Sequence, residues 1–149
     1  MADTSDHLEG EARAFVTAAR RATLATIAPD GRPRLVPVCF ELLANHVWIA
    51  LDDKPKRSTD PMDLARVRDV IDRPAVTLLV DRWDEDWERL GWVRIEGRAE
   101  VVDAVDPGHA AAIDALRAKY PQYRSHELGE RPAIRIEIER VVSWGDLRP

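Results

Sequence analysis

Residues 23–42, TLATIAPDGRPRLVPVCFEL, form the stretch that decides the fold class of this chain. Its first arm, residues 23–28, is a run of small, β-branched and apolar side chains that is typical of a strand. A turn follows at Pro29-Asp30-Gly31, where proline presets φ and glycine tolerates a positive φ. The second arm, residues 35–42, alternates between two faces, one with Val36, Val38, Phe40 and Leu42 and the other with Leu35, Pro37 and Cys39. The stretch therefore predicts a β-hairpin.

Pro37 interrupts the second arm of this hairpin. A proline has no backbone N–H and cannot donate to a strand ladder. We therefore expect Pro37 to lie at a sheet edge, or to face something other than a neighbouring strand.

The remaining segments predict a mainly β protein. Strand patterns occupy residues 47–51, 75–80, 92–102 and 133–142, which with the hairpin gives six strands. Helical spacing occupies residues 8–19, with Thr4, Ser5 or Asp6 as its cap, and two further helices begin at Pro61 and Pro107. Because these elements do not alternate as βαβ units, we expect a six-stranded antiparallel barrel with peripheral helices, spanning residues 1–149 as one domain.

Composition limits the classes of function. The chain has 149 residues and a formal net charge of −5, so a nucleic-acid partner is not expected. No apolar run approaches the ~20 residues of a membrane span, and the acidic, polar residues 1–11 lack a secretory signal, so we expect a cytoplasmic location. Cys39 is the single cysteine, which we interpret as a small packing residue, and the four histidines are scattered, so no metal site is predicted.

A cationic cluster, Lys54-Pro55-Lys56-Arg57, lies between a predicted strand and the next helix. On an acidic chain such a cluster suits a small phosphorylated ligand better than a polyanion, and Lys54, Lys56 and Arg57 could each give charge-assisted hydrogen bonds to phosphate. The alternative is a solvated loop balanced by the acids that flank the cluster, Asp52, Asp53, Asp60 and Asp63. Arg66 and Arg68 lie opposite the apolar stripe of the following helix, and we expect both to be solvated.

Three tryptophans, Trp83, Trp87 and Trp92, lie close together beside the acidic run 84–88. They could form an aromatic wall beside a planar ring, but burial in a subunit interface or core is the favoured interpretation. The acids could serve acid–base chemistry, although a hydrated loop is the commoner outcome. No nucleotide-binding glycine motif and no catalytic motif is present. Any enzymatic reactivity is therefore expected to come from an organic cofactor.

The order of several short motifs resembles the pyridoxamine-phosphate oxidase-like (FMN-binding split β-barrel) superfamily, in particular its branch of coenzyme F420 (deazaflavin)-dependent oxidoreductases. The resemblance covers roughly residues 12–144 and rests on Ala22-Thr23-Leu24-Ala25-Thr26, Asp30-Gly31-x-Pro33, Val36-Pro37-Val38-Cys39-Phe40, Asp53-Lys54-Pro55-Lys56-Arg57, Val80-Asp81, Asp86-Trp87 and Trp92-Val93-Arg94-x-x-Gly97. Asp69 departs from the pattern, since relatives often carry asparagine there.

The resemblance implies a homodimer of split barrels with a cofactor site at each side of the interface. It implies that Lys56, with Lys54 and Arg57, holds the cofactor phosphate, and that residues 36–38 (Val36, Pro37 and Val38) run beside the ring. Trp92 would approach the ring from the other subunit. The implied activity is hydride transfer from reduced F420 to a small unsaturated acceptor. The alternatives are an FMN-binding flavoenzyme and a non-catalytic protein that binds or sequesters a flavin.

Overall fold

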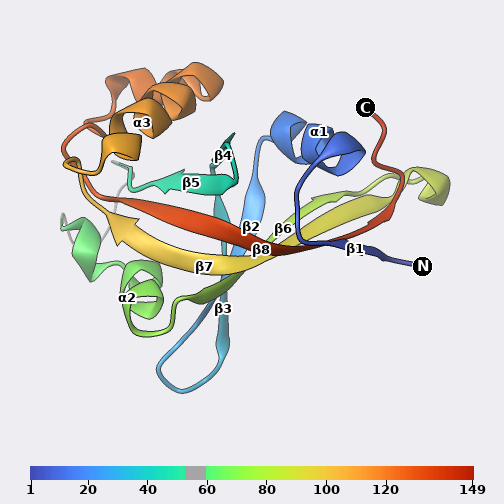
Figure 1. Ribbon diagram of the computed structural model, residues 1–149, viewed down its shortest axis with the longest axis horizontal. Helices are drawn as coiled ribbons and strands as arrows, with labels where there is room; N and C mark the ends of the chain where they lie inside the picture. Colours follow the sequence, from blue (N-terminus) through green and yellow to red (C-terminus); the bar gives the residue numbers. More distant parts are fainter. Residues whose placement is uncertain (53–59) are drawn as a thin grey trace.

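The computed structural model describes residues 1–52 and 60–149, and a strongly twisted antiparallel sheet dominates it (Figure 1). The strands are β1 Asp3–Ser5, β2 Ala22–Ile27, β3 Pro33–Val38, β4 Glu41–Leu43, β5 His46–Ala50, β6 Ala75–Arg82, β7 Gly91–Val102 and β8 Ala133–Gly145. The α-helices are α1 Gly10–Ala18, α2 Ala65–Asp72 and α3 Pro107–Lys119. Short 3₁₀ turns are η1 Pro61–Asp63, η2 Trp87–Arg89 and η3 Pro121–Ser125.

The strand order is β3-β2-β6-β7-β8-β5-β4, and β1 pairs with β8. Every pair is antiparallel, and β7 and β8 form the longest ladder, with a bulge at Glu96/Gly97. The predicted mainly β, antiparallel fold is confirmed. The described residues contain eight strands instead of six, because β1 was not foreseen and the second hairpin arm is divided.

The second arm of the hairpin is two strands, and the prediction of one continuous strand over residues 35–42 was wrong. β3 ends at Val38, β4 begins at Glu41, and the two lie at opposite ends of the strand order. At Phe40, between them, the backbone N–H donates to the Tyr120 hydroxyl at 3.1 Å, and the backbone carbonyl accepts from the same hydroxyl at 3.1 Å. The single hydroxyl proton of Tyr120 is shared between this carbonyl and that of Arg20, which lies at 3.0 Å. Because the Tyr120 hydroxyl takes the place of a strand partner at Phe40, the chain leaves one ladder here without exposing unpaired backbone.

The N-terminal residues differ from the prediction in a similar way. Residues Asp3–Ser5 do not cap a helix but pair with β8, with Thr4 opposite Val142. Helix α1 begins at Gly10 after Glu9, and no side chain caps it. The residues that the sequence offered as a helix cap are therefore paired with strand β8 instead.

Helices α2 and α3 begin close to the predicted prolines. In α3, Asp106 is the N-cap and accepts from the Gly108 N–H at 2.9 Å, with Pro107 in the first turn. In the α2 region, the first turn after Asp60 is the 3₁₀ segment η1, and the α-helix itself starts at Ala65.

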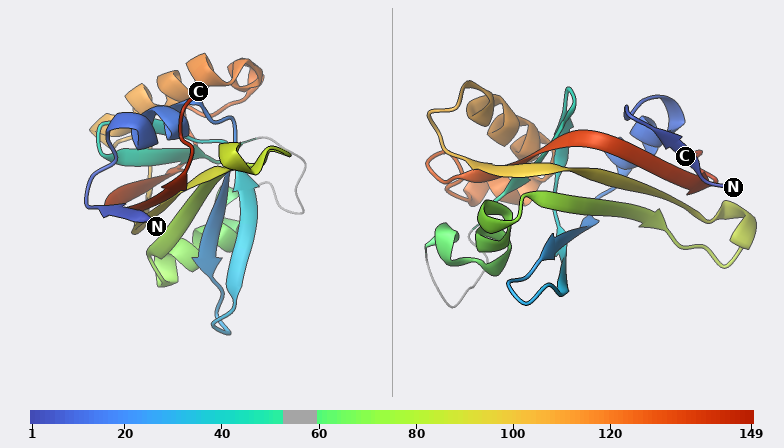
Figure 2. Two further views of the ribbon diagram at one scale, coloured as in Figure 1. Left: turned by 90° about the vertical axis from the view of Figure 1, so that its right-hand side faces the viewer. Right: turned by 60° about the horizontal axis from the view of Figure 1, so that its bottom comes forward.

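Two buried clusters hold the sheet and helices together. The larger lies inside the curved sheet and includes Leu24, Phe40, Ile49, Leu78, Ile95 and Ile136. The smaller lies under α3 and η3 and includes Trp48, Ala112, Leu116, Tyr123 and Leu128. The views in Figures 1 and 2 show α1 and α3 at opposite ends of the long β7–β8 ladder, with α2 beneath β7 and the β2–β3 hairpin projecting from the sheet.

Candidate cofactor site

The predicted phosphate-binding cations, Lys54, Lys56 and Arg57, lie outside the described residues. The predicted ring-side residues are described. β3 is the end strand of the order and pairs with β2 through residues 33–38, so the expectation that Pro37 lies at a sheet edge is confirmed. Val38 is buried in the larger core and Val36 is half-buried against it, whereas Pro37 is exposed on the opposite face.

Trp92 lines a cavity on the outward face of the sheet. The cavity has a volume of about 450 Å³, and its lining comes from four strands: Thr23, Ala25, Leu35, Thr77, Leu79, Asp81, Trp92 and Arg94. The Arg94 guanidinium lies 5.6 Å from the centroid of the Trp92 ring. Apolar walls with a few hydroxyl and charged groups are typical of a small-molecule pocket.

The strand register brings Pro37 and Trp92 to the same face of the sheet. Pro37 lies opposite Thr23, Thr23 opposite Leu79, and Leu79 opposite Arg94. Residues opposite one another in an antiparallel sheet share a face, and so do residues two apart on one strand. The structure therefore places Pro37 and Trp92 on one face of the sheet, on strands that β2 and β6 separate, and it turns Val36 and Val38 toward the core. Pro37 itself does not line the cavity.

A buried ion cluster centred on Asp69 fixes the β2–β3 hairpin to α2. The Asp69 carboxylate is 2% exposed, accepts hydrogen bonds from Thr26 Oγ1 and Arg34 Nε, both at 2.8 Å, and lies 3.6 Å from Arg73 Nη2. Burial by itself raises the pKa of Asp69, but the hydrogen bonds from Arg34 and Thr26 outweigh it, so the pKa lies below its usual value. The carboxylate at this position thus ties the hairpin to α2.

A second polar cluster lies where β5, α2 and η3 meet, and the sequence patterns did not reveal it. The Tyr123 hydroxyl donates to the buried Asp52 carboxylate at 3.0 Å, and Arg131 Nη1 donates to the Asp52 backbone carbonyl at 3.0 Å. Burial, the Asp52 charge and Cys39 all raise the pKa of Tyr123, which keeps its hydroxyl protonated. Arg66 faces this cluster, is half-buried, and has an Nε atom with no hydrogen-bond partner among the described residues.

The expectation that Arg66 is solvated was wrong, whereas Arg68 is exposed as predicted. Both arginines lie off the apolar stripe of one helix, so periodicity treats them alike. Arg66 is half-buried because it lies at the Asp52–Tyr123 cluster. Tyr123 is more than fifty positions from Arg66 in the sequence, so local periodicity does not report this burial. Cys39 is half-buried against the smaller core cluster, which confirms its interpretation as a packing residue.

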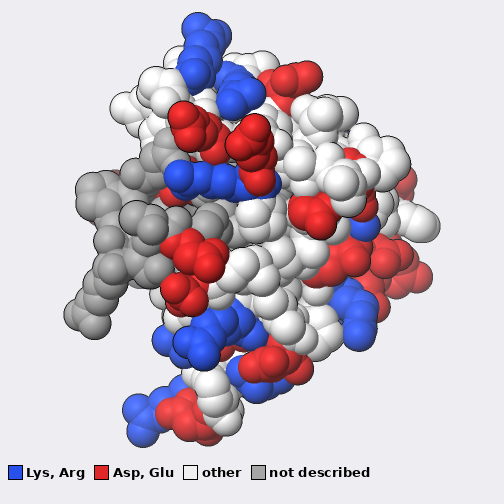
Figure 3. Space-filling model, turned by 90° about the vertical axis from the view of Figure 1, so that its left-hand side faces the viewer, with Lys and Arg blue, Asp and Glu red and all other residues white. Residues whose placement is uncertain are grey.

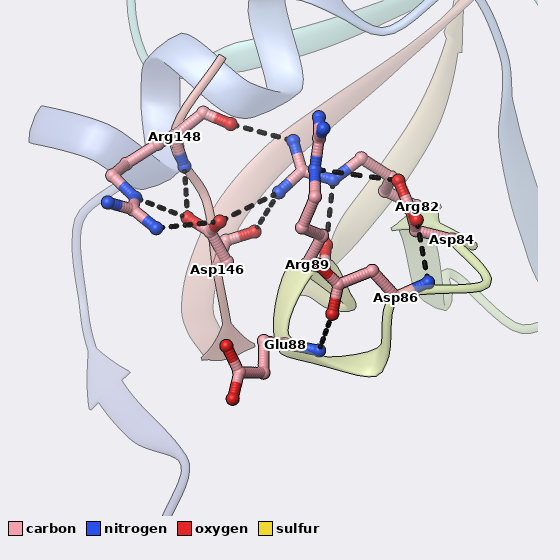
Figure 4. A network of polar contacts seen from close by, with 7 residues as sticks. All are labelled: Arg82, Asp84, Asp86, Glu88, Arg89, Asp146 and Arg148. Carbon is pink, nitrogen blue, oxygen red and sulfur yellow. Dashed lines mark hydrogen bonds and ion pairs between the residues drawn. The ribbon is translucent and has the colours of Figure 1, made fainter.

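The tryptophans and acids of the β6–β7 hairpin form its surface. Trp83 and Trp87 are 67% and 71% exposed, so neither lies in the core of the chain. Asp84 accepts from the Asp86 N–H at 2.8 Å, and Asp86 caps η2 by accepting from the Glu88 N–H at 3.1 Å. The acids that could have served acid–base chemistry therefore shape a turn (Figure 4).

The same hairpin binds the C-terminal segment. Arg82 donates to the backbone carbonyls of Asp146 and Arg148, both at 2.6 Å, and to that of Arg89 at 2.9 Å. The Asp146 carboxylate accepts from Arg148 Nε at 2.8 Å, and these hydrogen bonds hold the pKa of Asp146 well below its usual range (Figure 4). The network joins β6, η2 and the segment after β8.

Charge elsewhere is mixed. Figure 3 shows acidic and basic side chains interspersed over the face that lies at the left-hand side of Figure 1. A larger hollow of about 600 Å³ lies between α2 and the end of β7, lined by Met62, Ile71 and Val101 among others, and of the predicted site residues that the structure describes none lines it. Within residues 1–52 and 60–149, no group of three or more acids, histidines or cysteines is placed to hold a metal ion. No helix in the same residues is long and apolar enough to cross a membrane.

Several solved structures share this fold. A conserved hypothetical protein of Mycobacterium tuberculosis has a TM-score of 0.72 at 26% identity, and the match covers 97% of this chain and 89% of that one. A FAD-binding protein of Mesorhizobium loti has a TM-score of 0.64 at 23% identity, with coverage of 96% and 95%. An F420 reductase has a TM-score of 0.62 at 18% identity, with coverage of 87% and 94%. No curated protein matches the chain.

The sequence signature described as Pyridoxamine 5'-phosphate oxidase matches residues 8–145, which is nearly the whole chain. The matched region runs from the residues before α1 to the end of β8, and so includes strands β2 to β8 and the cavity beside Trp92. The predicted superfamily is thereby confirmed, and this chain belongs to the pyridoxamine 5'-phosphate oxidase family of split β-barrels.

Proposed function

We propose that this chain is a deazaflavin (coenzyme F420)-dependent oxidoreductase that transfers a hydride from the reduced cofactor to a small unsaturated acceptor. The observation that carries the proposal is the outward-face cavity of about 450 Å³, which places Trp92 on the same side of the sheet as Pro37 of the edge strand. Membership of the family and the shared fold with an F420 reductase support it. The expected location is the cytoplasm.

The lining of the cavity suits a planar heterocycle. Leu35, Leu79 and Trp92 supply apolar walls, while Thr23 and Thr77 add hydroxyl groups. A flat ring system with polar edges needs this combination of broad apolar contact and a few hydrogen-bonding groups. The residues present therefore fit the ring of F420, and equally that of FMN.

We propose that the functional unit is a homodimer. The outward face that carries the cavity also exposes apolar side chains, with Ile27 39%, Leu35 66% and Trp144 38% exposed. A monomer rarely leaves such side chains gathered on one face. A second copy would cover them, close the open side of the cavity, and bring Trp92 to the cofactor bound by its partner.

In this proposal the phosphate of the cofactor is held by Lys56 together with Lys54 and Arg57. Pro37 borders the ring because an edge position without a backbone N–H leaves no donor unpaired. Val36 and Val38 contribute by packing β3 against the core, which fixes the position of Pro37. The Asp69 cluster adds to this rigidity by tying the same hairpin to α2.

When bound in its reduced form, the deazaflavin supplies a hydride, and the protein supplies the surroundings of the transfer. The apolar walls exclude water and limit the orientations of a bound acceptor, which lowers the entropic part of the barrier. Arg94, stacked on Trp92, holds the indole in place and puts a positive charge at the edge of the cavity.

The test is an equilibrium titration of the purified chain with F420 and with FMN side by side, followed by fluorescence. We expect F420 to bind, the chain to elute as a dimer in size-exclusion chromatography with light scattering, and reduced F420 to be oxidised by at least one member of a panel of quinones, nitro compounds, enones and tetrapyrroles. Binding of neither cofactor would refute the proposal.

A flavin is the second candidate, and the shared fold with a FAD-binding protein favours it. FMN binding without F420 binding, together with a yellow purified protein, would assign the chain to the flavoenzymes. Binding of either cofactor without turnover of any acceptor in the panel would instead favour a protein that stores or sequesters a flavin.

A further inference from the structure

Of the described residues that line the outward-face cavity, Arg94 is the only one with a positive charge. Arg94 is half-buried, and its guanidinium lies 5.6 Å from the centroid of the Trp92 ring. Within residues 1–52 and 60–149, this guanidinium makes no ion pair and no hydrogen bond. The indole therefore steadies the guanidinium, while its five N–H donors have no protein acceptor in the described residues.

The neighbours of Arg94 on this face of the sheet do not supply an acceptor. The strand register places Leu79 of β6 and Val142 of β8 opposite Arg94, and both side chains are apolar. Glu96 is two positions further along β7, but its carboxylate accepts a hydrogen bond from Arg140 at 2.9 Å. Arg94 thus stands between apolar neighbours and a carboxylate that binds another arginine.

A second arginine of the same sheet shows how a stack of this kind is completed. The Arg135 guanidinium lies 5.5 Å from the centroid of the Trp48 ring, and it also binds two carboxylates. Its Nη1 atom donates to Asp106 at 3.1 Å, and it forms a salt bridge with Glu100. Arg94 has the same ring contact without a carboxylate in the described residues. A carboxylate from outside the chain would complete it.

Asp81 is the one carboxylate among the described residues that line the cavity. It lies opposite Trp92 in the register, so it is a diagonal neighbour of Arg94 on the same face. Asp81 is exposed, and it forms no ion pair with Arg94 in the described residues. The cavity therefore presents a half-buried cation at one place and a solvated anion at another, and the two act on a bound anion with opposite sign.

We propose that Arg94 is a specificity-determining residue that binds a carboxylate on the unsaturated acceptor. The planar guanidinium suits this group, because its donors can bind two carboxylate oxygens at once. The substrate class is then an unsaturated acid, with apolar contacts for its conjugated part and Arg94 for its charge. The inference rests on the proposed function in taking the acceptor as the source of the carboxylate.

The experiment compares two ligands that share a conjugated carbon skeleton and differ in charge, cinnamate and cinnamamide. Calorimetry measures the affinity of both, for the chain alone and for the chain loaded with whichever of F420 and FMN it binds. We expect wild type to bind cinnamate about tenfold more tightly than cinnamamide, the ratio for a charged hydrogen bond that solvent partly screens.

The variants change this ratio in different directions. R94Q should abolish the preference for cinnamate, and R94K, which keeps the charge without the planar fork, should retain part of it. D81N should increase the preference, because it removes a negative charge that repels the carboxylate. R98Q, which changes an exposed arginine on the same strand, should behave as wild type. A merely structural role of Arg94 would not give opposite effects of R94Q and D81N.

Equal affinity of wild type for the two ligands, an unchanged ratio in R94Q, or no binding of cinnamate to either form overturns the inference. A loss of F420 affinity or of the dimer in R94Q, with an unchanged ratio, places Arg94 at the cofactor or at the subunit contact and also overturns it. If wild type binds neither F420 nor FMN, the proposed function fails, and the titration of the chain alone still decides whether Arg94 binds a carboxylate.

Discussion

Replacing Asp69 with asparagine keeps the shape of the side chain and removes the charge at the centre of the buried cluster. The carboxylate of Asp69 accepts two hydrogen bonds of 2.8 Å, one from Thr26 and one from Arg34. One oxygen, Oδ2, accepts both bonds, so the amide oxygen of asparagine can take its place, but the NH₂ group would then stand where Oδ1 lies 3.6 Å from Arg73 Nη2. The variant therefore loses the charge that strengthens the hydrogen bond from Arg34 and that attracts Arg73.

The size of the effect follows from the exposure of the partners. A charged hydrogen bond contributes about 1.5–3 kcal/mol. The Asp69 side chain is 2% exposed, whereas that of Arg34 is 41% exposed, so solvent screens part of the interaction. We expect D69N to lower the free energy of unfolding by about 2 kcal/mol, equivalent to a fall of ~4–8 °C in the melting midpoint.

The pH dependence gives a sharper test. The pKa of Asp69 is lower in the folded than in the unfolded chain, so its stabilisation is complete above the unfolded value near ~3.9. As the pH falls further, toward the folded pKa, protonation of Asp69 removes that stabilisation. Asparagine does not titrate, so the difference between wild type and D69N should be constant from about pH 7 to pH 5 and narrow below about pH 4.

Urea unfolding at a series of pH values measures this difference directly. The matched control is D72N on the same helix, where Asp72 is 61% exposed and 3.9 Å from Arg73. We expect D72N to change stability by less than about 0.5 kcal/mol. A D69N midpoint equal to that of wild type, or a difference that does not depend on pH, would refute the reasoning.

Three further substitutions, and a fourth that serves as a control, test other parts of the structure. Lys56→Ala should weaken cofactor binding by about 1–3 kcal/mol in a fluorescence titration, and an unchanged dissociation constant would remove Lys56 from the site. Tyr120→Phe removes the hydroxyl that pairs both backbone groups of Phe40, and calorimetry should show a loss of about 1–3 kcal/mol, whereas unchanged stability would mean that water replaces the hydroxyl. Gly97→Ala would place a Cβ 2.3 Å from a backbone carbonyl of β8, and we expect a loss of about 3 kcal/mol in urea unfolding. Gly129→Ala, where a Cβ meets nothing within 4 Å, should change little, and equal effects of the two alanines would contradict this account of the bulge.

Much of the architecture could be read from local pattern. The runs of β-branched and apolar residues in 75–80 and 92–102 predicted β6 and β7, the alternation in residues 133–142 predicted β8, and Pro107 predicted the start of α3. These predictions succeeded because a strand with one buried face must alternate, and because a proline in the first helical turn lacks only an N–H that would be unpaired anyway. The lack of a ladder donor at Pro37 likewise predicted a sheet edge.

The candidate site was only partly predictable. Trp92 and Pro37 were selected as residues, but their common face depends on the register of four strands. The roles of Lys54, Lys56 and Arg57 remain predictions, as does the homodimer. The exposure of Arg66 was predicted wrongly. Periodicity indicates which side of a helix is apolar, but it does not indicate which distant segments pack against the polar side.

The sequence by itself determined the family, the antiparallel strands and the residue types available for a phosphorylated cofactor, since these depend on short-range order and spacing. Only the tertiary structure decided where the second hairpin arm breaks, because the Tyr120 hydroxyl that replaces the ladder at Phe40 lies 80 positions away. It also decided that Tyr123 bonds to Asp52, in a cluster whose charge acts on Arg66. The physical reason is that a local pattern of apolar and polar residues indicates which side chains are buried. The hydrogen-bond partner of a buried polar group depends instead on which distant segments pack beside it.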